Sequence, residues 1–166
     1  MLMDSGLVLE CKPFSVGFRA EHLQSEIEKS LYHEAAGHPA LPRGEYQLSQ
    51  HVEKRCVYTF CMCPGGYVVN ASSEPARLAV NGMSYSGRDG KNANSAIIVA
   101  VTPADYGSDH PLAGIEFQRG LEQRAYELCD GKLPVQRYGD FREKVTGEHP
   151  AETDGVQRSG QEALEP

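Results

Sequence analysis

The chain has 166 residues, of which 40% are hydrophobic and 23% charged, and it carries a net charge of -7 at neutral pH. This length suits one domain with a single core, and the balanced composition excludes a disordered chain. The 16 lysines and arginines are scattered in an acidic protein, which argues against nucleic-acid binding because that function needs clustered cations. The longest apolar run, 96–101, is too short to cross a membrane, and no secretion signal is recognisable, so we expect a cytoplasmic protein without a membrane span.

Strand and helix patterns alternate along the chain, which predicts an α+β fold. Phe14, Val16 and Phe18 alternate with small or polar residues in 14–22, as in a half-buried strand. Leu23, Ile27 and Leu31 then recur every four residues, which is typical of a short amphipathic helix. The next strand-like segments are expected to form an antiparallel β-meander or a partial barrel, and they cover 45–52, 56–62, 67–72, 77–83 and 94–102.

The sequence of the C-terminal third predicts one long helix followed by a tail. Apolar residues line one face of 112–129, and Asp130-Gly131-Lys132 would end this helix. The segment 105–110 has residue types that suit an acid-base site, but it is better interpreted as a loop that caps the long helix. From Arg142 onward there is no aromatic residue and no periodicity, so we predict a folded domain at 1–141 and a disordered or aberrant tail at 142–166.

Five cysteines are present, and two of them, Cys61 and Cys63, form a C-x-C pair. A zinc site would need a second clip, and a redox dithiol is usually C-x-x-C at a helix N-terminus. We therefore expect reduced thiols and no metal site. Residues two apart on a strand point the same way, so both thiols are predicted to face the core. A small metal or redox protein remains the alternative.

Two glycine-rich stretches are candidate binding surfaces. Pro64-Gly65-Gly66 lies between two strand patterns, either as a plain hairpin turn or as bare backbone against a flat ligand. The stretch 81–96 contains neither a P-loop nor a G-x-G-x-x-G motif, which excludes the two standard nucleotide sites. It is dense in donors and acceptors, which either make turns or contact a ligand: Arg88, Asp89, Asn92, Asn94 and Ser95.

Three stretches in this order resemble a known family: "KPFSVGFRAEH", "TFCMCPGGYVVNASSE" and "AVNGMSYSGRDGKNANSAIIVAV". They are similar to the non-Rossmann half of bacterial uncharacterised FAD-dependent dehydrogenases, also described as NAD(FAD)-utilising dehydrogenases. The resemblance extends over 1–141 and includes "PLAGIEFQRGLEQRAYEL" and "LPVQRYGDF". It implies that this chain is the substrate-side, C-terminal or inserted domain, which covers the flavin pocket of an oxidoreductase.

The resemblance also implies a cofactor, a partner and a set of site residues. FAD belongs to the full-length family, and because this chain lacks the glycine fingerprint we expect no tight FAD binding and no activity by the chain alone. The implied partner is an FAD-binding Rossmann domain, in the same gene or a separate chain. The alternative is a non-catalytic assembly module for such a chain. The residues expected to face the flavin or substrate are Cys61, Cys63, Pro64, Gly65, Gly66, Asn81, Met83, Ser84, Arg88, Asn92, Asn94 and Ser95.

In this implied site, three groups have distinct tasks. Arg88 would neutralise an anionic substrate or the reduced flavin. Asn92 and Asn94 would donate hydrogen bonds to it, and the backbone N–H groups of Gly65 and Gly66 would contact the ring edge. The redox chemistry itself would come from the cofactor.

Overall fold

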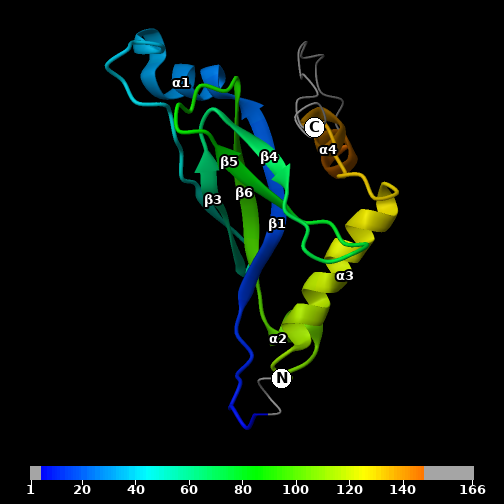
Figure 1. Ribbon diagram of the computed structural model, residues 1–166. Coiled ribbons are helices and arrows are strands. Elements are labelled where there is room, and N and C mark those ends of the chain that lie inside the picture. The colour runs from blue at the N-terminus through cyan, green and yellow to red at the C-terminus, as the bar shows by residue number, and fades with distance from the viewer. Residues whose placement is uncertain (1–4, 148–166) are drawn as a thin grey trace.

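The computed structural model describes residues 5–147, in which two antiparallel sheets are combined with helices (Figure 1). The strands are β1 (Phe14–Leu23), β2 (Ser49–Val52), β3 (Arg55–Cys63), β4 (Gly66–Asn70), β5 (Val80–Ser84) and β6 (Asn92–Val101). The helices are α1 (Gln24–Tyr32), the 3-10 turn η1 (His33–Ala35), α2 (Pro103–Tyr106), α3 (Ala113–Leu128) and α4 (Tyr138–Thr146). The predicted α+β class is confirmed, with one short and one long helix where the apolar periodicity placed them.

The strand order differs from a simple meander. The four-stranded sheet has the order β1-β6-β3-β2, and β4 and β5 form a separate two-stranded sheet. In β1, Phe14 lies opposite Val101 and Leu23 lies opposite Asn92, so the first and last strands pair along their whole length. Among the described residues no sheet closes into a barrel. Local alternation indicates where strands lie but not which distant strand they pair with, which is why the order was not predictable.

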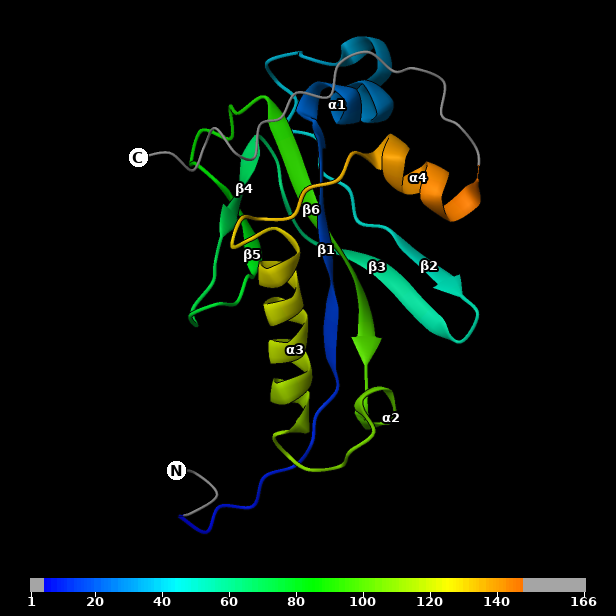
Figure 2. The same ribbon diagram turned by 90° about the vertical axis from the view of Figure 1, so that its right-hand side faces the viewer.

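The sheet register sorts side chains onto two faces. Residues directly opposite one another share a face, so Phe14, Val16 and Phe18 share one face with Val101, Val99 and Ile97. This apolar face receives α3 and α4 (Figure 2), since the ring of Phe14 lies 6.3 Å from that of Phe117 and the ring of Phe18 lies 6.1 Å from that of Phe141. The other face carries Arg19 and Asn94.

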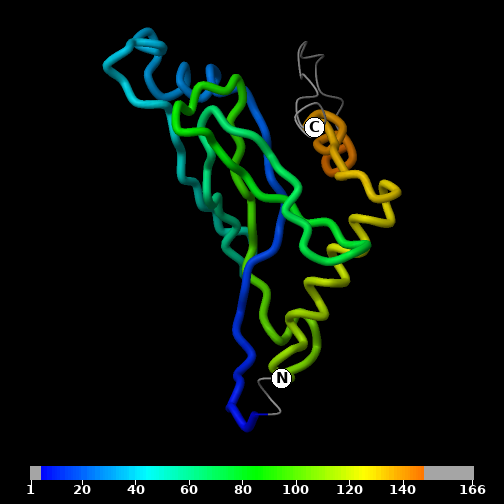
Figure 3. The backbone as a smooth tube through the Cα atoms, in the orientation of Figure 1, coloured from blue at the N-terminus to red at the C-terminus, as the bar shows by residue number. Residues whose placement is uncertain are grey.

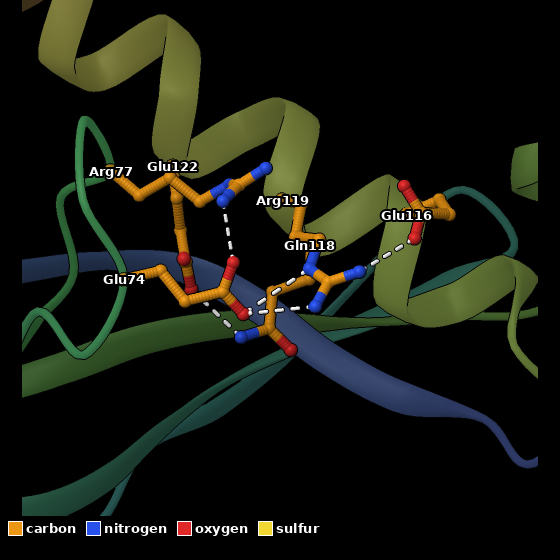
Figure 4. A network of polar contacts seen from close by, with 6 residues as sticks. All are labelled: Glu74, Arg77, Glu116, Gln118, Arg119 and Glu122. Carbon is orange, nitrogen blue, oxygen red and sulfur yellow. Dashed lines mark hydrogen bonds and ion pairs between the residues drawn. The ribbon is translucent and has the colours of Figure 1, made fainter. Parts of the chain in front are cut away.

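A polar network attaches α3 to the connection between β4 and β5 (Figure 4). Arg119 donates to Glu74 at 3.1 Å and to Glu116 at 2.7 Å, and Arg77 reaches the other oxygen of Glu74. The backbone N–H of Leu78 donates to the carbonyl of Glu122 at 3.0 Å, and the Leu78 side chain is buried. These contacts fix the position of α3, because they add directional bonds to its apolar packing.

The tube trace in Figure 3 shows β1 leading directly into α1 at one end of the sheet. The helix begins at Gln24, whose side chain is buried although it is polar. Its Nε2 donates to the carbonyl of Gly44 at 2.9 Å, and its Oε1 accepts the N–H of Gly65 at 2.9 Å. Gln24 thus ties the returning chain and the Pro-Gly-Gly turn to the end of β1.

Two predicted segments differ in the structure. Asp105 does not cap α3: it belongs to α2, where its carboxylate accepts the Thr102 N–H at 2.7 Å and pairs with Arg55. The bond from Arg55, followed by that from the Thr102 backbone, lowers the pKa of Asp105 to about 2. Helix α4 runs on to Thr146, so the first residues of the segment predicted as a disordered tail are helical. The predicted tail from 148 onward lies outside the described residues, and the division into two domains stays a prediction.

Within residues 5–147, no helix is long and apolar enough to cross a membrane. The same part of the chain contains no group of three or more side chains placed to hold a metal ion, and Cys11, Cys56, Cys61, Cys63 and Cys129 are free thiols.

Candidate functional site

The candidate site is built around Arg19 of β1, a residue that the sequence analysis did not single out. Its Nε donates to Asn94 Oδ1 at 2.8 Å, and its Nη2 donates to the carbonyl of Cys61 at 2.6 Å. Nη2 also lies 3.6 Å from the Cys63 Sγ, and Nη1 lies 3.4 Å from Asn81 Oδ1. We call these five residues, Arg19, Cys61, Cys63, Asn81 and Asn94, the Arg19 cluster. The structure therefore brings four of the predicted site residues together around one arginine.

A β-bulge in β3 shapes one wall of the cluster. Phe60 lies opposite Ala96 and Cys63 lies opposite Asn94, so β3 uses three steps where β6 uses two. Cys61 has a φ of 47°, a left-handed conformation that is uncommon for a residue with a side chain. The bulge interrupts the alternation: Cys61 is exposed and Cys63 is half-buried beside Arg19. The prediction that both thiols face the core is therefore wrong.

The Pro-Gly-Gly turn is covered by the chain itself. Pro64, Gly65 and Gly66 are buried, and a Cβ at Gly65 would lie 2.0 Å from the carbonyl oxygen of Arg88. The N–H of Gly90 donates to the Gly65 carbonyl at 3.1 Å. The bare backbone that the sequence indicated is thus approached closely by the loop at 88–90, and the Gly65 N–H is bonded to Gln24.

The amide of Asn94 is the most enclosed polar group of the cluster. Its side chain has 0% exposure and its Nδ2 has no hydrogen-bond partner among the described atoms. Gly82 of β5 presses on this pair, since a Cβ there would lie 2.3 Å from both Arg19 Nη2 and Asn94 Oδ1. Glycine at position 82 is therefore a condition for the close approach of β5 to Arg19.

A second polar pair, His22 and Tyr46, lies on the opposite side of β1 from Arg19. The His22 Nε2 and the Tyr46 hydroxyl are 2.6 Å apart. Burial lowers the pKa of His22 below its usual 6.5 and raises the pKa of Tyr46, whose hydroxyl also bonds Ser95. A neutral imidazole bonded to a neutral phenol is consistent with both directions.

The remaining predicted site residues have separate partners. Arg88 pairs with Glu45 at 2.5 Å, so its charge is already matched, and Asn92 Nδ2 donates to Glu21 at 3.1 Å. The Ser84 hydroxyl donates to the Pro64 carbonyl at 2.7 Å and so closes the turn. Met83 on β5 is 36% exposed, whereas Ser95 is fully buried. These residues do not join the Arg19 cluster.

Arg19 was recognisable from one signal in the sequence. In "FSVGFRAEH" the apolar alternation places Phe14, Val16 and Phe18 on the covered face, so Arg19 falls on the opposite face together with Gly17. An arginine in the middle of a half-buried strand requires acceptors from other segments, and those segments are far away in the chain.

Comparison with known proteins identifies the family. A family model described as FAD-dependent protein, C-terminal domain-like, matches residues 13–164, and this match runs past the boundary predicted at residue 141. An uncharacterized protein of Clostridium beijerinckii is 48% identical over 145 residues, which are 85% of this chain and 27% of that protein. The chain thus spans about a quarter of the length of this relative. Because the family model matches most of its length, this chain belongs to the FAD-dependent protein, C-terminal domain-like family.

Proposed function

We propose that the chain is the substrate-side domain of an FAD-dependent oxidoreductase of the dehydrogenase type, and that it covers the flavin pocket of the FAD-binding Rossmann part. The family match supports a domain of an FAD-dependent protein. When bound, FAD would supply the two-electron chemistry, and this chain would shape and close the pocket. We keep the cytoplasm as the predicted location, which the five free thiols support.

The observation that carries this proposal is the Arg19 cluster beside the exposed ring of Phe60, on the face of the four-stranded sheet opposite the one that contacts α3 and α4. Phe60, Ala96 and Arg19 lie opposite one another across three strands, and Phe60 is 56% exposed. An exposed aromatic ring beside a cation and several amides is suited to a flat ligand with polar edges. The residues that we assign to the flavin-facing surface are therefore Arg19, Phe60, Cys61, Asn81 and Met83, rather than the covered Gly65 and Gly66.

The hydrophobic surface supports a large covering partner. Only Leu78, Ala93 and Val101 are buried hydrophobic residues in the described part of the chain, whereas large apolar side chains on both faces of the sheet, among them Phe18, Phe60 and Leu48, are more than half exposed. So many exposed apolar side chains favour burial against a partner. The matched part is 27% of the Clostridium beijerinckii protein, so most of that relative is available to cover such a surface.

The test uses this chain together with the remainder of the Clostridium beijerinckii protein, expressed without its matched region. Alone, the purified chain is expected to be colourless and to bind no FAD tightly. Added to the FAD-loaded remainder, it should bind and change the flavin fluorescence. Phe60→Asp should abolish that change, and Val8→Asp, at a side chain that is 90% exposed, serves as the matched control. A yellow isolated chain, or a Phe60→Asp variant that behaves like the control, contradicts the proposal.

The exposed apolar surface also favours the second candidate, a non-catalytic assembly module. The two candidates differ in where the flavin lies relative to the Arg19 cluster. An assembly module would bind the remainder equally well with and without FAD and would leave the flavin fluorescence unchanged. A flavin cover would bind the FAD-loaded form more tightly, because part of its contact surface is the cofactor itself.

A further inference from the structure

We infer that the exposed side of the Arg19 cluster is a subsite for a small oxyanion, a carboxylate or phosphate group that binds between the Arg19 guanidinium and the Asn81 amide. The inference rests on the proposed function only for the source of the anion, which is either the substrate or the flavin cofactor. The recognition chemistry, a guanidinium and amide donors around a negatively charged oxygen, is the same for both sources.

The charge of Arg19 is unmatched within the described residues. All of its bonding partners there are neutral: two amide oxygens, one backbone carbonyl and one thiol. Other partly covered arginines pair with carboxylates, as Arg43 does with Glu28 and Arg119 does with Glu74. A half-buried guanidinium held only by neutral acceptors attracts an anion more strongly than a paired one, because no counter-charge must be displaced.

The guanidinium is also held in place before any ligand arrives. The bonds to Asn94 Oδ1 and to the Cys61 carbonyl, at 2.8 and 2.6 Å, fix its plane, and Gly82 packs directly against it. Nη1 makes only the long 3.4 Å contact with Asn81 Oδ1, on the exposed side of the cluster. This nitrogen therefore has donor capacity left for a ligand, and its fixed position lowers the entropic cost of binding.

The two amides beside the guanidinium have different tasks. Asn94 is fully buried and its Oδ1 accepts the Arg19 Nε–H, so Asn94 positions the guanidinium and does not contact the ligand. The exposed Asn81, whose Oδ1 accepts the Gly82 N–H at 2.8 Å, would direct its amide nitrogen to the ligand.

The experiment is a side-chain NMR titration of the full chain with sodium acetate and, separately, with sodium phosphate, each against sodium chloride at equal ionic strength. We expect saturable shifts of the Arg19 Nε–Hε signal and of the Asn81 side-chain amide. A response to acetate indicates a substrate carboxylate as the natural anion, and a response to phosphate indicates the cofactor. If neither anion gives a saturable shift of these signals in the wild-type chain, the inference is overturned.

Substitution sharpens the result. Arg19→Gln should weaken binding by about 10- to 100-fold, the range for loss of a charged hydrogen bond. Arg124→Gln, at an exposed arginine of α3, is the matched control and should leave the affinity unchanged. An Arg19→Gln variant that folds and binds like the control also overturns the inference, and if this variant does not fold, the wild-type titration decides. No flavin is needed, so the outcome is independent of whether the chain covers a flavin pocket.

Discussion

Replacement of Gly65 by alanine tests whether the Pro-Gly-Gly turn is built for close approach by its own chain. Gly65 has a φ of +52°, and an added Cβ would lie 2.0 Å from the carbonyl oxygen of Arg88. The loop at 88–90 must then move away. Its movement, with the shift of the turn that follows, would break the bond from the Gly90 N–H to the Gly65 carbonyl and the bond from the Gly65 N–H to Gln24.

The expected cost follows from these terms. The left-handed backbone costs about 1 kcal/mol with a side chain, and each of the two hydrogen bonds contributes about 1 kcal/mol, so Gly65→Ala should lower the free energy of unfolding by roughly 3 kcal/mol. Gly37→Ala is the matched control, because Gly37 has a φ of +84° with nothing within 4 Å of its added Cβ. The control should cost only the backbone term, about 1 kcal/mol.

Urea unfolding of the full chain, followed by circular dichroism, gives both values. The two variants should differ by about 2 kcal/mol, which is well above the usual error of the method. If Gly65→Ala costs no more than Gly37→Ala, the covering loop does not press on the turn, and the bare backbone remains open to a ligand after all.

Three further predictions concern titration and thiol access. Burial lowers the pKa of His22, so below pH 6.5 the unfolded chain takes up a proton that the folded chain does not, and the free energy of unfolding decreases as the pH is lowered. Urea unfolding at several pH values should show a smaller decrease below pH 6.5 in His22→Gln than in the wild type, and an equal decrease contradicts this. The bond from Arg55 holds the pKa of Asp105 at about 2, so the ionised carboxylate stabilises the fold above pH 3.8, and this stabilisation is lost as the pH falls towards 2. The difference in the free energy of unfolding between wild type and Asp105→Asn should shrink over that range, whereas a constant difference refutes the pairing. Cys61 is the exposed thiol among the five, so Cys61→Ser should remove the fastest phase of labelling by a thiol reagent, and persistence of that phase would show that the bulge does not expose it.

The local elements were predictable because their signals are local. The alternation of Phe14, Val16 and Phe18 reflects one covered face of β1, and the four-residue spacing of Leu23, Ile27 and Leu31 reflects one face of α1. Helix α4 was missed because "YGDFREKVT" has few apolar residues and no strong periodicity; it lies against the sheet through the contact between Phe141 and Phe18. Contact with the rest of the fold decides whether such a segment is helical.

The site was predictable in part, for a related reason. The density of Asn, Gly and Ser in 81–96 and the C-x-C pair indicated the right surface, and Cys61, Cys63, Asn81 and Asn94 do meet there. The residue that joins them was missed because Arg19 comes from the first strand, and its partners are set by the pairing of β1 with β6. The bulge at Cys61 depends on register between distant strands, which single-strand patterns do not contain.

The most direct test of the central claim is the solvent access of the flavin in the full-length Clostridium beijerinckii relative. Iodide quenching of flavin fluorescence would be measured in the intact protein and in a form that lacks the region matched by this chain. If this domain covers the flavin pocket, the intact protein should hold FAD that is weakly quenched, and the shortened form should hold FAD that is quenched several times more strongly. Equal quenching in the two forms, or an intact protein that holds no flavin, would contradict the account.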